Sequence, residues 1–128
     1  MKKILIVDDS KTARMFIRTC FNMCGYDQHE FVEAVNGKEA LDLIKGDYGV
    51  PDLLVTDINM PIMNGIDLLK KIRVSPQTTG IPVLVITSTS NRLREEDLER
   101  LGNTSVLMKP ISPARLLEAL KQVVEEGV

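Results

Sequence analysis

Short apolar runs alternate along this chain with stretches whose apolar residues recur at helical spacing. The runs lie at 4–7, 30–35, 53–55, 81–87 and 104–108. Branched apolar runs of this length are typical of strands buried on both faces of a parallel sheet. Strands that alternate with helices form one such sheet, covered on both faces and joined by right-handed crossovers. We therefore expect an α/β fold with a doubly wound, five-stranded parallel sheet.

The stretches between these runs carry the signals that begin and end helices. Ser10 and Ser112 stand where N-caps are expected, and Gly25 is placed to end the first helix. The expected inward-facing residues are Ala13, Phe16, Ile17, Cys20, Phe21 and Cys24, then Ala40, Leu41 and Ile44, then Ile66, Leu69 and Ile72, and finally Leu116, Leu117, Leu120, Val123 and Val124. A further helix over 92–101 has few apolar residues, so it should be the least stable.

Composition excludes several classes of protein. The 128 residues, 44% hydrophobic and 27% charged, suit one compact domain. A net charge of -2 without a dense run of Lys or Arg argues against nucleic-acid binding. No segment resembles a signal peptide or could cross a bilayer, so we expect a cytoplasmic protein without a membrane partner. Cys20 and Cys24 are expected to be buried thiols rather than a redox pair or half a metal site.

Polar residues stand where the expected strands end. Asp8 and Asp9 follow the first run, Asp57 follows the third, Thr87 ends the fourth and Lys109 follows the fifth. Singly, each is explained as a loop acid, a helix cap, an ordinary strand residue or a solvated lysine. The carboxyl ends of parallel strands meet at one edge, however, where such sheets bind ligands. We therefore expect these five side chains to form one site.

The expected cluster has the groups that phosphoryl transfer requires. Carboxylates repel one another by about 4 kcal/mol for each pair at about 4 Å and an effective dielectric constant of about 20. An acid-rich set of oxygen ligands suits Mg²⁺, whose positive charge would offset this repulsion. Lys109 and Thr87 could bind phosphoryl oxygens, and Asp57 could act as the nucleophile.

Four segments carry a resemblance to a known family. In order and spacing, residues 8–10, 56–65, 86–88 and 109–110 resemble the receiver domains of two-component response regulators, and among them the single-domain chemotaxis type. The resemblance spans essentially the whole chain. It implies a flavodoxin-like fold with strand order 2-1-3-4-5, and one receiver domain over residues 1–128 with no output domain.

The resemblance also implies a role for each acidic residue. Asp57 would accept a phosphoryl group from a phosphohistidine on a sensor histidine kinase or phosphotransfer protein. Asp9 and Asp57 would bind Mg²⁺ directly, Asp8 directly or through water, and the backbone carbonyl of Asn59 would be a further ligand. The chain would be a signalling domain that catalyses only its own phosphorylation and dephosphorylation, not an enzyme acting on other substrates.

Thr87 and Lys109 would bind the phosphoryl oxygens, and the Lys109–Pro110 peptide bond is expected to be cis. The signal would pass by phosphorylation-dependent binding of a downstream protein to a monomer or weak dimer. Val106 stands where the family commonly has a Tyr or Phe, so the aromatic part of the usual switch is absent.

Several residues near the expected site are open to two interpretations. Asn59 and Thr89 either border the path of the water that hydrolyses the acyl phosphate or are ordinary loop residues. Met15, which lies off the apolar stripe of its helix, either helps to dock a phosphodonor or is plain surface. His29 lies away from the site and is expected at the surface.

Other functions remain alternatives. A phosphate-independent binding module on a receiver fold is favoured only by Val106. A phosphatase with an aspartyl nucleophile would need a second acid and a cap over its substrate. A flavin-binding protein fits worse, because Asp8 and Asp9 would face the cofactor phosphate.

Overall fold

The computed structural model describes residues 2–88, 98, 100 and 102–123. Five parallel strands form one sheet in the order β2-β1-β3-β4-β5. The strands are β1 (Lys3–Val7), β2 (Glu30–Ala34), β3 (Leu53–Thr56), β4 (Val83–Thr87) and β5 (Thr104–Met108). The expected doubly wound α/β fold and its strand order are confirmed.

The register aligns the carboxyl ends of the strands. Val7 of β1 lies opposite Ala34 of β2 and Thr56 of β3. Thr87 of β4 lies opposite Met108 of β5. The strand order reverses beside β1, which pairs with β2 on one side and β3 on the other. Residues that follow these strands therefore come out at one edge, next to the reversal where ligands bind in sheets of this kind.

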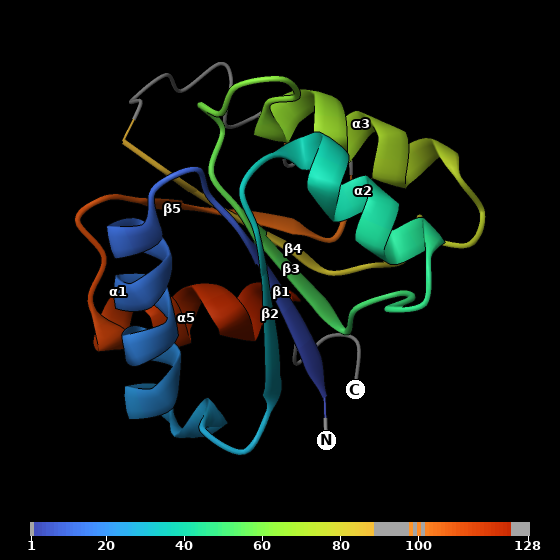
Figure 1. Cartoon of the computed structure of the whole chain (residues 1–128). Coiled ribbons are helices and arrows are strands. Elements are labelled where there is room, and N and C mark those ends of the chain that lie inside the picture. The colour runs from blue at the N-terminus through green and yellow to red at the C-terminus, as the bar shows by residue number, and fades with distance from the viewer. Residues whose placement is uncertain (1, 89–97, 99, 101, 124–128) are drawn as a thin grey trace.

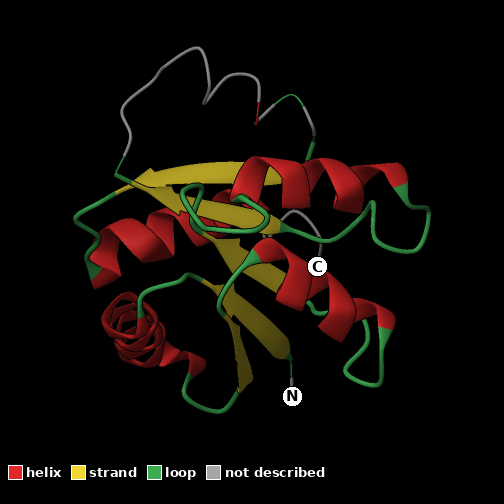
Figure 2. Ribbon diagram, turned by 45° about the horizontal axis from the view of Figure 1, so that its top comes forward, coloured by secondary structure: helices red, strands yellow, loops and turns green. Residues whose placement is uncertain are grey.

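Helices cover both faces of the sheet. They are α1 (Lys11–Phe21), the short helical segment η1 (Asn22–Tyr26), α2 (Gly37–Lys45), α3 (Gly65–Val74) and α5 (Pro113–Val123). Figure 1 shows α1 and α5 on one face and α2 and α3 on the other, and the layers are also visible in Figure 2. Most of the expected helix over 92–101 lies outside the described residues, although Leu98 is buried against the α2 and α3 side of the core. Within the described part of the chain, no helix is long and apolar enough to span a membrane.

Side-chain caps fix where the helices begin. The pairs, named cap first, are Ser10 with the N–H of Ala13 (3.2 Å), Asn36 with Glu39 (2.9 Å), Asn64 with Asp67 (2.9 Å) and Ser112 with Arg115 (3.3 Å). Each cap of this kind stabilises a helix by about 1 kcal/mol. The expected caps Ser10 and Ser112 are confirmed. At its other end α1 continues into η1, where Gly25 has a left-handed φ of 93°, which glycine adopts readily.

The sheet separates two apolar clusters. Ile4, Ile6, Ile17, Phe21, Val55, Leu116 and Leu120 belong to the cluster beneath α1 and α5. Leu5, Val7, Leu54, Leu68, Leu69 and Val85 belong to the cluster beneath α2 and α3. For two residues the prediction of burial in the core is wrong: Phe16 is 51% exposed and Leu117 is 40% exposed. Both lie on the margin of an apolar stripe, and on α5 the smaller Ala119 is buried instead. Val124 lies outside the described residues.

The two cysteines and the histidine lie within the packing of the α1 side. Cys20 is buried and Cys24 is half-buried, and both are free thiols. Burial raises the pKa of each thiol, which keeps it protonated and unreactive. The His29 ring lies 4.9 Å from the Tyr26 ring, centroid to centroid, at a tilt of 54°. His29 directly precedes β2, at the edge opposite the carboxyl ends of the strands. It is half-buried rather than fully on the surface, but it is remote from the expected site as predicted.

Candidate functional site

Three carboxylates meet at the carboxyl edge of the sheet. Asp8 and Asp9 follow β1 and Asp57 follows β3. One carboxylate oxygen of each residue lies within 4.8 Å of one from each of the other two. Asp8 is 1% exposed and Asp57 is 9% exposed, whereas Asp9 is exposed to solvent. The structure therefore brings together acids that are nearly fifty positions apart in the sequence.

Backbone hydrogen bonds hold the two buried carboxylates in place. The Asp8 N–H donates to the Ala34 carbonyl at 3.1 Å, and the Asp57 N–H donates to the Val7 carbonyl at 3.0 Å. The Asp8 Oδ1 atom accepts from the Ser10 N–H at 2.9 Å, and the Asp57 Oδ1 atom accepts from an N–H of its own loop, that of Ile58, at 2.7 Å. Each carboxylate is thus anchored by one oxygen and keeps its other oxygen, Oδ2, toward the cluster.

Lys109 supplies a positive charge to the cluster from the opposite end of the chain. Its Nζ atom lies 3.5 Å from Asp8 Oδ2 and 3.7 Å from Asp57 Oδ2. The Lys109 N–H donates to the carbonyl of Thr87 at 2.8 Å, which ties the two expected site residues together. Thr87 is the last residue of β4 and is fully buried. The expected cis bond between Lys109 and Pro110 is present.

The electrostatic environment of Asp57 opposes its ionisation. Burial raises the pKa of its carboxyl group, and the Asp8 carboxylate adds to this rise. The Lys109 ammonium and the N–H groups of Ile58 and Asn59 act in the opposite direction but do not cancel it. Lys109 therefore offsets only part of the cost of holding Asp57 as a carboxylate.

The donor set fits a hard divalent cation. Three carboxylates offer oxygen ligands within reach of one ion, and the exposure of Asp9 leaves one side open to water. Mg²⁺ takes one or two carboxylates and keeps several waters, so this arrangement suits it. Asn59, two residues beyond Asp57, is also exposed to solvent. A dication here would supply the positive charge that Asp57 lacks.

The loop after Asp57 folds back against the site. The Gly65 N–H donates to the Ile58 carbonyl at 2.9 Å. A Cβ atom on Gly65 would lie 2.0 Å from the carbonyl oxygen of Asp57, so only glycine fits this close approach. On its other side the loop is tied to the start of α2, because the Gly37 N–H donates to the Met63 carbonyl at 3.0 Å. Asp57 thus begins a loop that is fixed at both ends.

Arg14 is a residue at the site that the sequence analysis missed. Its guanidinium donates through Nη1 to the Asp8 carbonyl at 2.6 Å and through Nε to Glu33 Oε1 at 2.7 Å. Its side chain is only 13% exposed. Arg14 therefore anchors the peptide unit between Asp8 and Asp9 to α1 and β2. The only signal in the sequence was its position off the apolar stripe of α1, which also fits a solvated arginine.

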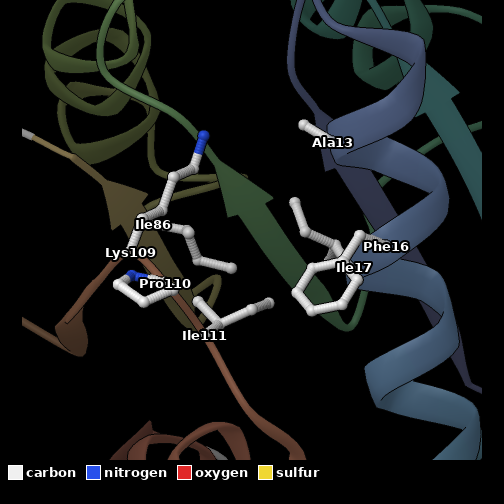
Figure 3. Close-up of a pocket in the computed structure, with 7 residues that line it drawn as sticks. All are labelled: Ala13, Phe16, Ile17, Ile86, Lys109, Pro110 and Ile111. Carbon is white, nitrogen blue, oxygen red and sulfur yellow. The ribbon is translucent and has the colours of Figure 1, made fainter.

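An apolar pocket of about 440 Å³ adjoins Lys109. Figure 3 shows Ala13, Phe16 and Ile17 of α1 facing Ile86, Pro110 and Ile111 across it, with Lys109 beside them. The Phe16 ring lines this pocket instead of the core, which accounts for its exposure. Met15, its neighbour, is 59% exposed, as predicted.

The remaining predicted positions lie at the margins of the site. Val106 is half-buried in β5 and packs against the α2 and α3 side of the core, so no aromatic ring occupies this position. Asn59 is exposed beside the acidic cluster. Thr89 lies outside the described residues.

Comparisons with known proteins agree with this geometry. A family model for the response regulator receiver domain matches residues 4–121. The chain is 39% identical over 124 residues to the chemotaxis protein CheY-3 of Vibrio cholerae, covering 96% of this chain and 92% of that protein. It is 34% identical over 125 residues to the chemotaxis protein CheY homolog of Campylobacter jejuni, covering 98% and 94% respectively.

Solved structures give the same result. The chemotaxis protein CheY4 of Vibrio cholerae superposes with a TM-score of 0.81 at 31% identity, over 96% of this chain and 98% of that chain. The receiver domain of Francisella response regulator 1452 superposes with a TM-score of 0.81 at 29% identity, over 100% of both chains. The chain therefore belongs to the response regulator receiver domain family.

Proposed function

We propose that this chain is a stand-alone response regulator that accepts a phosphoryl group on Asp57 in a Mg²⁺-dependent reaction. The donor is a phosphohistidine on a sensor histidine kinase or phosphotransfer protein. The observation that carries the proposal is the position of Asp57, with Asp8 and Asp9 within 4.8 Å and Lys109 at 3.7 Å. Phosphoryl transfer depends mainly on positioning and charge neutralisation, and this cluster would supply both once it holds Mg²⁺.

The transfer is a direct displacement at phosphorus. The Asp57 carboxylate oxygen forms the new P–O bond, and the P–N bond to the donor imidazole breaks. The bonding electron pair stays on the imidazole nitrogen, so the donor leaves as a neutral histidine after protonation from solvent. The product is an acyl phosphate on Asp57.

Each residue of the site has a part in this step. Lys109, already within 4 Å of both buried carboxylates, binds an equatorial phosphoryl oxygen, and the Thr87 hydroxyl donates to another. Asp8, Asp9 and Asp57, whose carboxylate oxygens lie within 4.8 Å of one another, would hold the metal ion together with the Asn59 carbonyl. When bound, Mg²⁺ neutralises charge on the phosphoryl oxygens and on the carboxylates. The salt bridge from Asp8 keeps the Lys109 ammonium directed into the site.

The proposal extends to partners and location. Residues 1–128 act as one receiver domain in the cytoplasm, as a monomer or weak dimer, and the signal passes by docking to a downstream protein. The apolar pocket between α1 and Lys109 opens beside the site and suits an apolar side chain of the donor protein. The Campylobacter jejuni relative, a named chemotaxis protein, is covered over 94% of its length, which supports a stand-alone regulator in a motility pathway.

Mass spectrometry of the intact protein tests the proposal. Phosphoramidate with Mg²⁺ should add one phosphate to the wild type and none to Asp57→Asn or to wild type in EDTA. A wild type that stays unmodified would favour a phosphate-independent binding module. Release of more than one equivalent of phosphate from a phosphomonoester would favour a phosphatase.

A further inference from the structure

Ile62 has a backbone conformation that its side chain disfavours. Its φ is 68°, in the left-handed region, where a β-branched residue is a genuine outlier. Among the described residues, the other non-glycine residue with positive φ is Asn103, a type that tolerates this region. Such strain persists only where the surroundings impose it, and it is concentrated at functional sites.

Hydrogen bonds on both sides of Ile62 impose the conformation. The Met63 N–H donates to the Pro61 carbonyl at 2.7 Å, which closes a tight turn around Ile62. Met63 is bound in turn to Gly37 at the start of α2, and Gly65 is bound to Ile58. The turn therefore holds the Ile62 side chain outward, where it is 79% exposed.

Exposed apolar side chains lie on segments that adjoin the three acids in the chain or in the sheet. Met15 and Phe16 lie on α1, 59% and 51% exposed, and Val35 follows β2, 39% exposed. Ile62 lies on the loop that Asp57 begins, and of these four side chains it is the most exposed.

We propose that Ile62 is a contact residue for the phosphodonor protein, whose surface buries this side chain when its phosphohistidine reaches Asp57. The inference rests on the proposed function. A role in donor binding explains why a β-branched residue has a left-handed backbone conformation. The strained turn lowers the stability of the unbound protein, but it presents an apolar side chain to the donor.

The position of Asp57 identifies the donor as the occupant. Asp57 is 9% exposed, so a phosphohistidine can reach it only if the protein that carries it covers the edge of the sheet. The loop of Ile62 forms part of that edge, because it starts at Asp57 and is bound back to Ile58. A downstream target does not have to reach the Asp57 carboxylate.

Three variants test the inference. Ile62→Asn removes the apolar contact and suits the left-handed turn, Ile62→Leu keeps an apolar contact, and Val74→Asn is the matched control. Val74 is also β-branched and 81% exposed, but it ends α3, at the far end of that helix from Gly65. The protein donor is the sensor kinase that, after autophosphorylation with radiolabelled ATP, labels the wild type fastest in a purified panel. The small donor is phosphoramidate.

We expect Ile62→Asn to lower the rate of transfer from the kinase by about tenfold, as loss of a buried contact at an interface does. The same variant should keep the phosphoramidate rate and raise Tm by about 3–6 °C, because it relieves the turn. Ile62→Leu should keep the kinase rate within about twofold, since the apolar contact remains. Val74→Asn should change neither the kinase rate nor the phosphoramidate rate.

Equal kinase rates for Ile62→Asn and wild type would overturn the inference. Equal losses with both donors would also overturn it, because the change would then act on Asp57 itself. An Ile62→Asn variant that is no more stable than wild type would contradict the cost assigned to the turn. Failure of phosphoramidate to label even the wild type would instead refute the proposed function.

Discussion

The proposed reaction needs Asp57 to be both buried and ionised as a nucleophile, and these two needs conflict. Burial raises the pKa of its carboxyl group, and the neighbouring Asp8 adds to the effect. Lys109 is shared between Asp57 and Asp8, so it offsets only part of the cost. The site therefore holds an unfavourable electrostatic interaction that a bound cation would offset.

In metal-free buffer at neutral pH, Asp57→Asn should raise Tm by a few degrees. A raised pKa in the folded state means that the native protein binds this proton more tightly than the unfolded chain does. Wild type therefore loses stability as the pH rises from the ordinary carboxyl value of 3.8 through the folded-state pKa, and the variant does not. Thermal denaturation followed by circular dichroism across this pH range measures the difference.

The advantage of the variant should disappear at acid pH, where the carboxyl group of wild type is protonated in both states. Asp42→Asn serves as the control, because Asp42 is 66% exposed and its ion pair with Lys38 lies in solvent. Exposed pairs of this kind contribute little to stability. An Asp57→Asn variant less stable than wild type at neutral pH would contradict the electrostatic account.

At the scale of the elements, Arg14 connects α1 and β2 to the loop that carries the acids. It holds the Asp8 carbonyl and the Glu33 carboxylate at once. Groups that orient metal ligands from behind commonly change metal affinity when they are removed. α1 thus takes part in the site through Arg14 as well as through the apolar pocket.

Arg14→Met should lower Mg²⁺ affinity by about tenfold, because the Asp8–Asp9 peptide unit loses its anchor. It should also lower the free energy of unfolding by about 2 kcal/mol through loss of charge-assisted hydrogen bonds. Isothermal titration calorimetry and denaturant unfolding measure the two effects. Arg18→Met is the matched control, since Arg18 also pairs with Glu33, at 3.8 Å, but has no bond to Asp8. Equal Mg²⁺ affinities in the two variants would refute the anchoring role.

Elements with strong local signals could be predicted from the sequence, whereas contacts between distant segments could not. The strand bounds at 104–108 follow from a branched run cut off by Lys109 and Pro110, and the structure has the same bounds. Phe16 and Leu117 were assigned to the core wrongly, because periodicity cannot tell the margin of a stripe from its centre. The left-handed turn at Ile62 could not be predicted, because it depends on two hydrogen bonds of Met63: its N–H donates to the Pro61 carbonyl, and its carbonyl accepts from the Gly37 N–H.

More of the candidate site than of the side-chain packing could be predicted from the sequence. The carboxyl ends of parallel strands share an edge whatever the details of the core, so strand ends alone place Asp8, Asp57 and Lys109 together. The pairing of Arg14 with Glu33 depends on how α1 lies against β2. Nothing local in the sequence fixes that angle.

For the whole molecule, the unbalanced acids predict that Mg²⁺ stabilises the fold. At a Mg²⁺ concentration of about 100 times Kd, the free energy of unfolding should rise by about 2.7 kcal/mol. Thermal denaturation with MgCl₂, with EDTA and with NaCl at matched ionic strength measures this effect. Asp9→Asn should reduce it, because this change removes one of the three carboxylates. Equal stabilisation by NaCl would show general screening in place of a bound ion.

The salt bridge between Asp8 and Lys109 joins residues 101 positions apart. During synthesis on the ribosome, the aspartates emerge long before the lysine that faces them. A nascent chain that has not reached Lys109 would have its acids but no opposing amine, so under the proposed function it would not yet accept a phosphoryl group. Competence to respond would arrive late in translation, together with the last strand of the sheet.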